Sequence, residues 1–386
     1  MKMTLKDTCE FYSGTGFPTV YQGSASGKYP FYKVGDISKN VQQGYKFLEI
    51  CDNYIDDDIL KQIKGVLIPK NSIAFAKIGE ALKLNRRAIT KQDCLVDNNA
   101  VAICPNQAIL DVDYFYYFMR TVNMTEYSSS TTVPSVKKSS LEKIQLPVPT
   151  LNEQKNIANE LNFINNALSL AKQRLLSLDE LVKSRFIELF GDCTNNTNGW
   201  AISKLNDICD VRDGTHDSPE YFSVGVPLIT SKNISSGYLD FSNVSLISEK
   251  DAEQINKRSK VDKGDILLPM IGTVGGAVIV EVEPNFCIKN VALIKFTKSD
   301  ISNIFVREYL NSDAVNTIFE SVKNGGTQKF VGLGTIRNLP ISIPPISLQN
   351  EFAEFVKLID KSKFIVQQQI KDLEELLDSK MDEYFR

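Results

Sequence analysis

The sequence has a single histidine, His216, and its seven cysteines are scattered and form no Cys-x-x-Cys pair. One histidine argues against a His-based hydrolase and against a His-rich metal site. An odd number of widely spaced cysteines is typical of reduced thiols and not of a disulfide framework or a zinc site. The composition therefore predicts a cytoplasmic protein without a bound metal.

The chain also lacks long apolar runs and an excess of positive charge. No run approaches the roughly 18 residues that a membrane-spanning helix needs, and the N-terminus lacks the apolar core of a signal peptide. Hydrophobic residues make up 42% of the chain and charged residues 24%, as in soluble globular proteins. With a net charge of −3, the chain needs local basic patches or a partner's charge to hold nucleic acid.

Catalytic signatures are missing as well. Gly23–Lys28 is one residue short of a phosphate-binding loop, and Tyr29 follows it where that loop needs Ser or Thr, so we expect a surface loop. Ile343–Ile346 contains two prolines but has the wrong flanking residues for the amino-methyltransferase motif. No glycine-rich dinucleotide motif follows an apolar run. We predict that the chain is not an enzyme.

What the sequence does contain is a long internal repeat. Shifted by 195 residues, Leu141–Phe190 aligns with Ile336–Phe385 without a gap. The identical residues are Pro149, Gln154, Ala158, Leu178, Glu180, Leu181, Ser184, Glu188 and Phe190 in the first copy and Pro344, Gln349, Ala353, Leu373, Glu375, Leu376, Ser379, Glu383 and Phe385 in the second. A repeat of this length predicts a molecule with two similar halves.

Both copies carry apolar residues at alternating steps of three and four, which is the a/d seam of a coiled coil. The seam consists of Ile157, Leu161, Ile164, Leu168, Leu175, Leu178 and Val182 in the first copy and Phe352, Val356, Ile359, Val366, Ile370, Leu373 and Leu377 in the second. Within the second copy, Lys363 breaks the apolar pattern. We expect two long helices that pack on each other antiparallel. The alternative is that each helix packs only on its own globular part.

The globular parts repeat more loosely than the helices. Leu5–Thr15 aligns with Leu205–Thr215, and Pro30–Ile37 aligns with Pro227–Ile234. Within these parts we expect strands at Gly65–Ile68 and Asp265–Leu268 and helices at Tyr114–Thr121 and Ser302–Leu310.

These elements predict an α+β protein with a pseudo-twofold internal repeat. Two similar mixed α/β domains, residues 1–146 and 193–340, are separated by two long antiparallel coiled-coil helices, residues 147–192 and 341–386.

Polar, cationic and glycine-rich clusters are the candidates for recognition, because amides and cations bind base edges and phosphates. In the first half these candidates are Lys33, Lys77, Arg86, Arg87, Lys137 and Lys138. In the second half they are Arg212, His216, Thr230, Lys232, Asn233, Lys323, Thr327, Gln328 and Lys329. For any one of these residues a solvated surface side chain is the plain alternative.

Several of these segments resemble one family in combination. Leu146–Ala158, the heptads that follow and Phe190–Asp192 resemble the conserved region of type I restriction–modification specificity subunits. Asp213–Tyr221 and Gly325–Gln328 are similar to that family too. The resemblance covers essentially the whole chain. The first half departs from it in detail, with Gly16 where the second half has His216.

The resemblance implies that the globular parts are target recognition domains, each reading one half of a bipartite, asymmetric DNA target. It implies that the helices space the domains and dock two copies of a DNA adenine methyltransferase subunit. The methyltransferase would bind S-adenosylmethionine, and a restriction and translocase subunit would bind ATP and magnesium, so this chain itself would hold no cofactor. The alternatives are a coiled-coil DNA-binding scaffold or regulator without a restriction partner, and a stand-alone DNA methyltransferase or nuclease.

Overall fold

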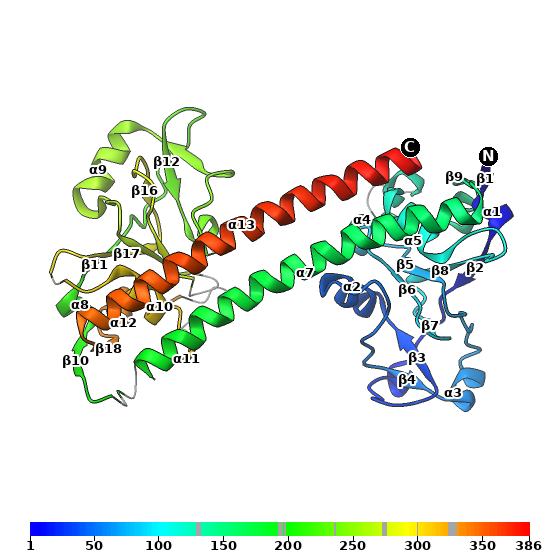
Figure 1. Ribbon diagram of the computed structural model, residues 1–386, viewed down its shortest axis with the longest axis horizontal. Helices are drawn as coiled ribbons and strands as arrows, with labels where there is room; N and C mark the ends of the chain where they lie inside the picture. The colour runs from blue at the N-terminus through cyan, green and yellow to red at the C-terminus, as the bar shows by residue number, and fades with distance from the viewer. Residues whose placement is uncertain are drawn as a thin grey trace. The chain divides into compact units, whose positions relative to one another are not determined.

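A computed structural model of the chain describes residues 1–128, 133–191, 196, 198–234, 237–271, 276–298, 300–322 and 330–386 (Figure 1). The chain forms two compact units. Unit 1 comprises Met1–Gln173 with Gln367–Arg386, and unit 2 comprises Arg174–Val366. Each unit therefore contains one globular part, the first half of one long helix and the second half of the other.

Unit 1 has three small sheets. Its strands are β1 (Lys2–Thr4), β2 (Cys9–Ser13), β3 (Tyr29–Tyr32), β4 (Tyr54–Ile55), β5 (Ile73–Ala76), β6 (Arg87–Ile89), β7 (Leu95–Val96), β8 (Ala100–Pro105) and β9 (Gln145–Pro147). The strand orders are β1-β9, β2-β8-β5-β6 and β4-β3-β7. All pairings are antiparallel except β3 with β7, which is parallel.

Unit 2 repeats this topology strand for strand. Its strands are β10 (Ala201–Lys204), β11 (Asp210–Asp213), β12 (Val226–Ile229), β13 (Ser245–Ile247), β14 (Ile266–Pro269), β15 (Val278–Ile279), β16 (Cys287–Ile288), β17 (Val291–Lys295) and β18 (Pro340–Ile343). The orders are β10-β18, β11-β17-β14-β15 and β13-β12-β16, with β12 and β16 again parallel. The internal repeat therefore extends through the globular parts.

Short helices connect the strands. In unit 1 they are α1 (Leu5–Thr8), η1 (Thr19–Tyr21), α2 (Val34–Gln42), α3 (Asp57–Gln62), α4 (Glu80–Lys83), α5 (Val112–Thr121), η2 (Met124–Tyr127) and α6 (Lys138–Leu141). In unit 2 they are α8 (Leu205–Ile208), η3 (Ser231–Asn233), α9 (Glu249–Ser259), α10 (Asn303–Leu310), α11 (Asp313–Val322) and α12 (Leu333–Arg337). The two helices that the sequence predicts in the globular parts are confirmed as α5 and α10.

One of the two predicted strands is wrong. Asp265–Leu268 corresponds to β14, but Gly65–Ile68 is a loop whose only ladder contact is an isolated bridge from Ile68 to Cys94. The strand of unit 1 that matches β14 is β5, because each is the third strand of its four-stranded sheet. The apolar run at Gly65–Ile68 instead packs Leu67 and Ile68 into small hydrophobic clusters.

The long helices are α7 (Leu151–Phe190) and α13 (Ile346–Phe385), each of 40 residues. In unit 1 the first half of α7 packs with the last half of α13 against α5 and the four-stranded sheet, in one cluster that contains Leu161, Leu168 and Leu377. In unit 2 the last half of α7 packs with the first half of α13 in a cluster that contains Val182 and Phe352. The pairing is therefore antiparallel in both units, as the sequence predicts.

Every predicted seam residue is buried or half-buried. Lys363, which interrupts the seam, is 21% exposed, and its Nζ lies 2.6 Å from Oδ1 of Asp179 on α7. In unit 1 the ion pair between Lys172 and Glu374, at 2.7 Å, also joins the two helices. Polar contacts of this kind at a seam set which residues face each other, at some cost in stability.

Candidate nucleic-acid interface

Three loops meet at one end of the sheets in each unit, and we name this place the loop junction. In unit 2 the loops follow β11, β12 and β16. The N–H of Thr215 donates to the Ile288 carbonyl at 3.1 Å, and the N–H of Lys289 donates to the Ile229 carbonyl at 2.9 Å. Because β12 and β16 are parallel, both of their loops leave the same sheet edge.

In unit 1 the loop junction is built from the same bonds. The N–H of Thr15 donates to the Val96 carbonyl at 2.8 Å, and the N–H of Asp97 donates to the Tyr32 carbonyl at 3.0 Å. The three loops follow β2, β3 and β7, which are the counterparts of β11, β12 and β16. The repeated Gly-Thr pair of the sequence therefore has one structural place in both units.

The glycine of that pair is required by a close approach of two backbones. A Cβ on Gly214 would lie 2.3 Å from the Ile288 carbonyl oxygen, and a Cβ on Gly14 would lie 1.7 Å from the Asp97 carbonyl oxygen. No side chain fits at these separations. This part of the motif therefore shapes the loop.

His216 is fixed at the loop junction of unit 2 by two hydrogen bonds. Its Nδ1 lies 2.9 Å from Oδ1 of Asn290, and its Nε2 lies 2.9 Å from Oδ2 of Asp213. The other carboxylate oxygen of Asp213 pairs with Arg258 of α9. The hydrogen bonds to Asn290 and Asp213 raise the pKa of His216 above its ordinary value. The imidazole nevertheless stays 52% exposed.

The polar cluster after β12 divides into one structural residue and two surface residues. Asn233 is 5% exposed; its Oδ1 accepts from the N–H of Thr230 at 3.0 Å, and its amide donates to the carbonyls of Asp240 and Asn243. The prediction that Asn233 contacts DNA is therefore wrong, because its side-chain oxygen and nitrogen are both hydrogen-bonded inside the loop. Lys232 is exposed and Thr230 is half-buried.

Lys33 occupies the same position in unit 1 that Thr230 occupies in unit 2. The N–H of Lys33 donates to Oδ2 of Asp36 at 2.7 Å, which matches the bond between Thr230 and Asn233. The Lys33 ammonium donates to Oε1 of Gln22 at 3.3 Å. The loop junctions thus share their backbone and differ in the side chains that they present.

The other basic candidates of unit 1 lie near this end of the four-stranded sheet. Lys77 follows β5, and its N–H donates to the Asn99 carbonyl at 2.8 Å, beside the loop after β7. Arg86 precedes β6, which is antiparallel to β5 and so begins where β5 ends. Lys137 and Lys138 are exposed next to Val136, whose N–H donates to the Lys77 carbonyl at 2.9 Å.

Arg87 does not belong to this surface, and its assignment to DNA contact is corrected. Its side chain is 2% exposed, and its guanidinium donates to the Asn85 carbonyl at 2.9 Å and to the Val122 carbonyl at 2.6 Å. Burial lowers the pKa of this group. Arg87 holds β6 to the segment after α5, and its neighbour Arg86 is half-buried.

The remaining candidates of unit 2 are Arg212 and the glycine-rich loop. Arg212 is paired with Asp210 at 2.6 Å and donates to the Arg258 carbonyl at 3.0 Å, with 39% of its side chain exposed. Lys323, Thr327, Gln328 and Lys329 lie outside the described residues. The segment that follows them begins with Phe330, which bridges to Ile271 just beyond β14. Phe330 therefore lies at the loop-junction end of the sheet.

Sequence reasoning missed Asn290, Lys289 and Arg258. Asn290 and Lys289 directly follow the short strand β16, so an alignment of Cys287–Asn290 with Leu95–Asn98 would have pointed to them. Arg258 had no such signal, because it reaches Asp213 from the end of α9.

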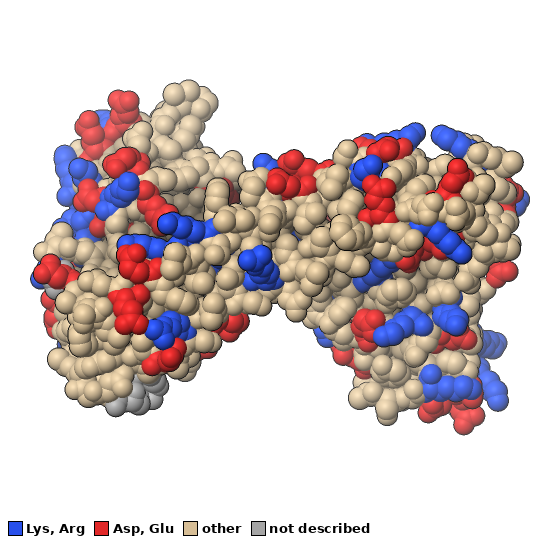
Figure 2. Space-filling model, viewed as in Figure 1, with Lys and Arg blue, Asp and Glu red and all other residues tan. Residues whose placement is uncertain are grey.

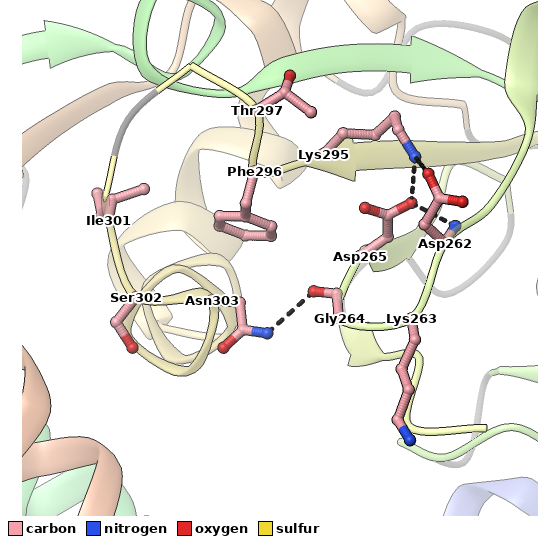
Figure 3. A pocket seen from close by; sticks show the side chains of 10 residues that line it. All are labelled: Asp262, Lys263, Gly264, Asp265, Lys295, Phe296, Thr297, Ile301, Ser302 and Asn303. Carbon is pink, nitrogen blue, oxygen red and sulfur yellow. Dashed lines mark hydrogen bonds and ion pairs between the residues drawn. The ribbon is translucent and has the colours of Figure 1, made fainter. Parts of the chain in front are cut away.

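A second polar cluster in unit 2 is structural. Lys295 is 6% exposed, and its ammonium donates to Asp265 at 2.6 Å, to Asp262 at 2.8 Å and to the Lys260 carbonyl at 3.1 Å. The cluster borders a cavity of about 400 Å³ that Phe296 and Ile301 line on the other side (Figure 3). Since all three ammonium hydrogens are engaged, this lysine has no donor left for a ligand.

Charges of both signs are mixed on the face that Figure 2 shows. In the view of Figure 2, Lys and Arg side chains alternate with Asp and Glu over the surface and form no broad field of one sign. Among the described residues, no group of three or more His, Cys, Asp or Glu side chains is arranged to hold a metal ion. No described helix is both long and apolar enough to cross a membrane.

Comparisons with known proteins agree with this architecture. The sequence matches the type I restriction modification DNA specificity domain twice, over residues 1–180 and 197–375. The chain belongs to the family of type I restriction–modification specificity subunits, a non-catalytic class.

Specificity subunits of other organisms match this chain over part or nearly all of its length. The MjaIX specificity subunit of Methanocaldococcus jannaschii is 23% identical and covers 97% of this chain and 90% of its own length. The EcoBI specificity subunit of Escherichia coli is 25% identical over 63% of this chain and 58% of its own length. The S subunit from M. genitalium shares the fold, with a TM-score of 0.57 and 15% identity, over 100% of this chain and 96% of that one.

Proposed function

We propose that this chain reads a bipartite, asymmetric DNA target, with one half-site recognised at the loop junction of each unit. The observation that carries the proposal is that the two loop junctions share one backbone arrangement but present different side chains. Gly16, Lys33 and Asp97 in unit 1 stand where unit 2 has His216, Thr230 and Lys289. Direct readout depends on the donors and acceptors that side chains present. Two different sets on one scaffold select two different half-sites.

The charge pattern fits a reader that works inside a larger complex. The net charge is −3. Among the described candidates for DNA contact, the fully exposed cations are Lys137, Lys138 and Lys232. Phosphate neutralisation supplies much of the affinity of protein–DNA complexes. The proposed partners are two copies of a DNA adenine methyltransferase and a restriction and translocase subunit. They supply the remaining positive charge that neutralises the DNA phosphates.

The long helices offer one equivalent apolar surface in each unit for such a partner. In unit 1, Phe163 and Leu170 of α7 and Leu376 of α13 are 76%, 65% and 43% exposed. In unit 2 the residues at the repeat-equivalent positions, Leu358, Ile365 and Leu181, are 62%, 58% and 46% exposed. Clusters of exposed apolar side chains mark interaction surfaces. We name these two sets the apolar triads.

The repeat distinguishes the triads from other exposed apolar side chains of the helices. Leu176 and Phe364 are also exposed, but their repeat counterparts are Lys371 and Ser169. A surface that recurs in both units serves two copies of one partner. Within a heptad, the triad residues occupy positions c and g, on one flank of the seam. In the proposed complex the methyltransferase binds S-adenosylmethionine and the motor subunit binds ATP and magnesium.

The decisive experiment is reconstitution with the cognate methyltransferase subunit. Single-molecule sequencing of the methylated DNA should show methyladenine at one split, asymmetric motif. A complex that methylates a continuous motif, or DNA without sequence preference, would contradict the proposal. The isolated chain with DNA, labelled S-adenosylmethionine and magnesium serves as the control. Turnover in that control would favour a stand-alone enzyme, and partner binding without sequence preference would favour a scaffold.

A further inference from the structure

His216 is the one imidazole of the chain, and both of its ring nitrogens face oxygen atoms. Oδ1 of Asn290 and Oδ2 of Asp213 each lie 2.9 Å from a ring nitrogen. A carboxylate oxygen and an amide oxygen are acceptors only. Only the protonated imidazolium can donate from both nitrogens, so this pair of acceptors favours the protonated ring.

The groups around the ring come from three elements. Asp213 belongs to β11, Arg258 to α9, and Asn290 to the turn between β16 and β17. Arg258 pairs with the second oxygen of Asp213 and opposes the proton on His216, whereas Asp213 and Asn290 favour it. Arg212 is paired with Asp210, and Lys289 donates to Ser218. The hydrogen bonds to Asn290 and Asp213 outweigh the opposing effects of burial and of Arg258, so the pKa of His216 is raised.

We propose that His216 is a titratable DNA contact. Its imidazolium, held by hydrogen bonds to Asp213 and Asn290, strengthens the binding of unit 2 to its half-site, and this binding weakens as the pH rises. The proposal rests on the function proposed above. The ring is half exposed at the loop junction. Both of its N–H groups stay engaged with Asp213 and Asn290, so the contact with phosphate is electrostatic and uses the charge of the ring without a ring N–H donor. The Asp213 carboxylate is only 8% exposed, so it presents little negative charge to an approaching phosphate.

The sign of the effect follows from proton linkage. The charged ring binds phosphate and the neutral ring does not, so affinity is highest below the pKa of His216 and falls as the pH passes through it. Bound phosphate stabilises the proton further. Unit 1 has Gly16 at this position and no titratable side chain there. The pH dependence therefore belongs to one half-site of the target.

The protonation itself is measurable without DNA. Since the chain has one histidine, a tag-free preparation gives one set of imidazole C–H signals in an NMR titration. We expect a midpoint above the ordinary value of 6.5. Asn290→Asp, which leaves only acceptor atoms on that side, should raise the midpoint further. A midpoint at or below 6.5 in the native chain would overturn the proposal.

The DNA contact is tested on the reconstituted methyltransferase complex between pH 6 and 8.5. Native affinity should fall about fivefold to tenfold across this range at about 0.1 M salt, as expected for one lost phosphate contact. His216→Gln should remove the pH dependence and lower the slope of log affinity against log salt at pH 6 by about 0.9. His216→Arg, a permanent cation, should bind with no pH dependence and keep the salt slope.

Two outcomes separate the two proposals. A complex that selects a split motif with the same affinity at every pH would refute the role of His216 and leave the proposed function standing. A complex without any sequence preference would refute the proposed function, whatever the NMR midpoint. DNA that keeps the unit 1 half-site and ends before the unit 2 half-site, so that its phosphates are absent, should show no pH dependence in the native complex.

Discussion

Gln154 Oε1 accepts a hydrogen bond from the backbone N–H of Asp111 at 2.8 Å, and thereby ties the first turn of α7 to the N-terminus of α5. The Gln154 amide donates to the carbonyls of Ile109 and Pro149, both at 2.9 Å, and the side chain is fully buried. In unit 2, Gln349 does the same for α13 and α10, with its Oε1 accepting from the N–H of Ser302 at 2.9 Å. This bond explains why the repeat keeps glutamine at both positions.

Replacing either glutamine should destabilise only its own unit. Gln349→Leu leaves buried backbone groups without partners, and we expect a loss of about 3 kcal/mol in the free energy of unfolding of unit 2. Urea denaturation followed by the fluorescence of Trp200, the one tryptophan of the chain, measures unit 2. Gln154→Leu should shift the far-UV circular dichroism and leave the Trp200 transition in place. Asn350→Leu, an exposed position of α13 in unit 2, is the control and should change stability by less than about 0.5 kcal/mol.

The buried ion pair of unit 2 should be replaceable by the neutral pair of unit 1. Ile73 pairs with Ile103 as Ile266 pairs with Ile294, so Ser72 and Cys104 are the counterparts of Asp265 and Lys295. Lys295→Met alone leaves the buried Asp265 carboxylate without its ion-pair partner, and we expect a loss of about 3–5 kcal/mol in the free energy of unfolding of unit 2.

Asp265→Ser combined with Lys295→Cys should recover most of that loss, because the buried charge is gone. The Trp200 transition in urea measures both variants. If the double variant is less stable than Lys295→Met, the ion pair itself stabilises the unit and the replacement argument is wrong.

The loop-junction glycines should tolerate no side chain. Gly214→Ala puts a methyl group 2.3 Å from the Ile288 carbonyl oxygen, so the loop that carries His216 must move. We expect the reconstituted complex to lose at least tenfold in affinity for DNA with both half-sites and to become insensitive to scrambling of the unit 2 half-site. Gly14→Ala should do the same for the other half-site. Gly35→Ala, where no atom lies within 4 Å of the added Cβ, should bind as the native chain does.

The apolar triads should each hold one copy of the methyltransferase. Leu170→Glu in unit 1 or Ile365→Glu in unit 2 places a charge in the proposed contact, and native mass spectrometry should show complexes with one methyltransferase in place of two. The double variant should bind none. Ser169→Glu adds the same charge to the exposed residue next to Leu170 and should leave the stoichiometry at two. Two bound copies on the double variant would place the docking surface elsewhere.

Much of the architecture could be predicted because it follows from periodicity. Apolar residues at alternating steps of three and four must share one helix face, so α7, α13 and their antiparallel contact follow from the chain alone. The loss of periodicity in short segments explains the error at Gly65–Ile68. An apolar run of four residues is equally suited to a strand and to a buried loop, and only its neighbours decide.

The sequence by itself determined that the protein has two equivalent halves, long paired helices and membership of its family, because these are properties of repeated pattern. Only the tertiary structure decided which candidate side chains are buried and which are exposed. Arg87 and Arg86 are adjacent in the chain, yet the first is buried against Val122 and the second reaches the surface. His216 gains its clamp from Asn290, 74 residues away. Burial and protonation depend on neighbours that the fold brings together, and no local spacing in the sequence records them.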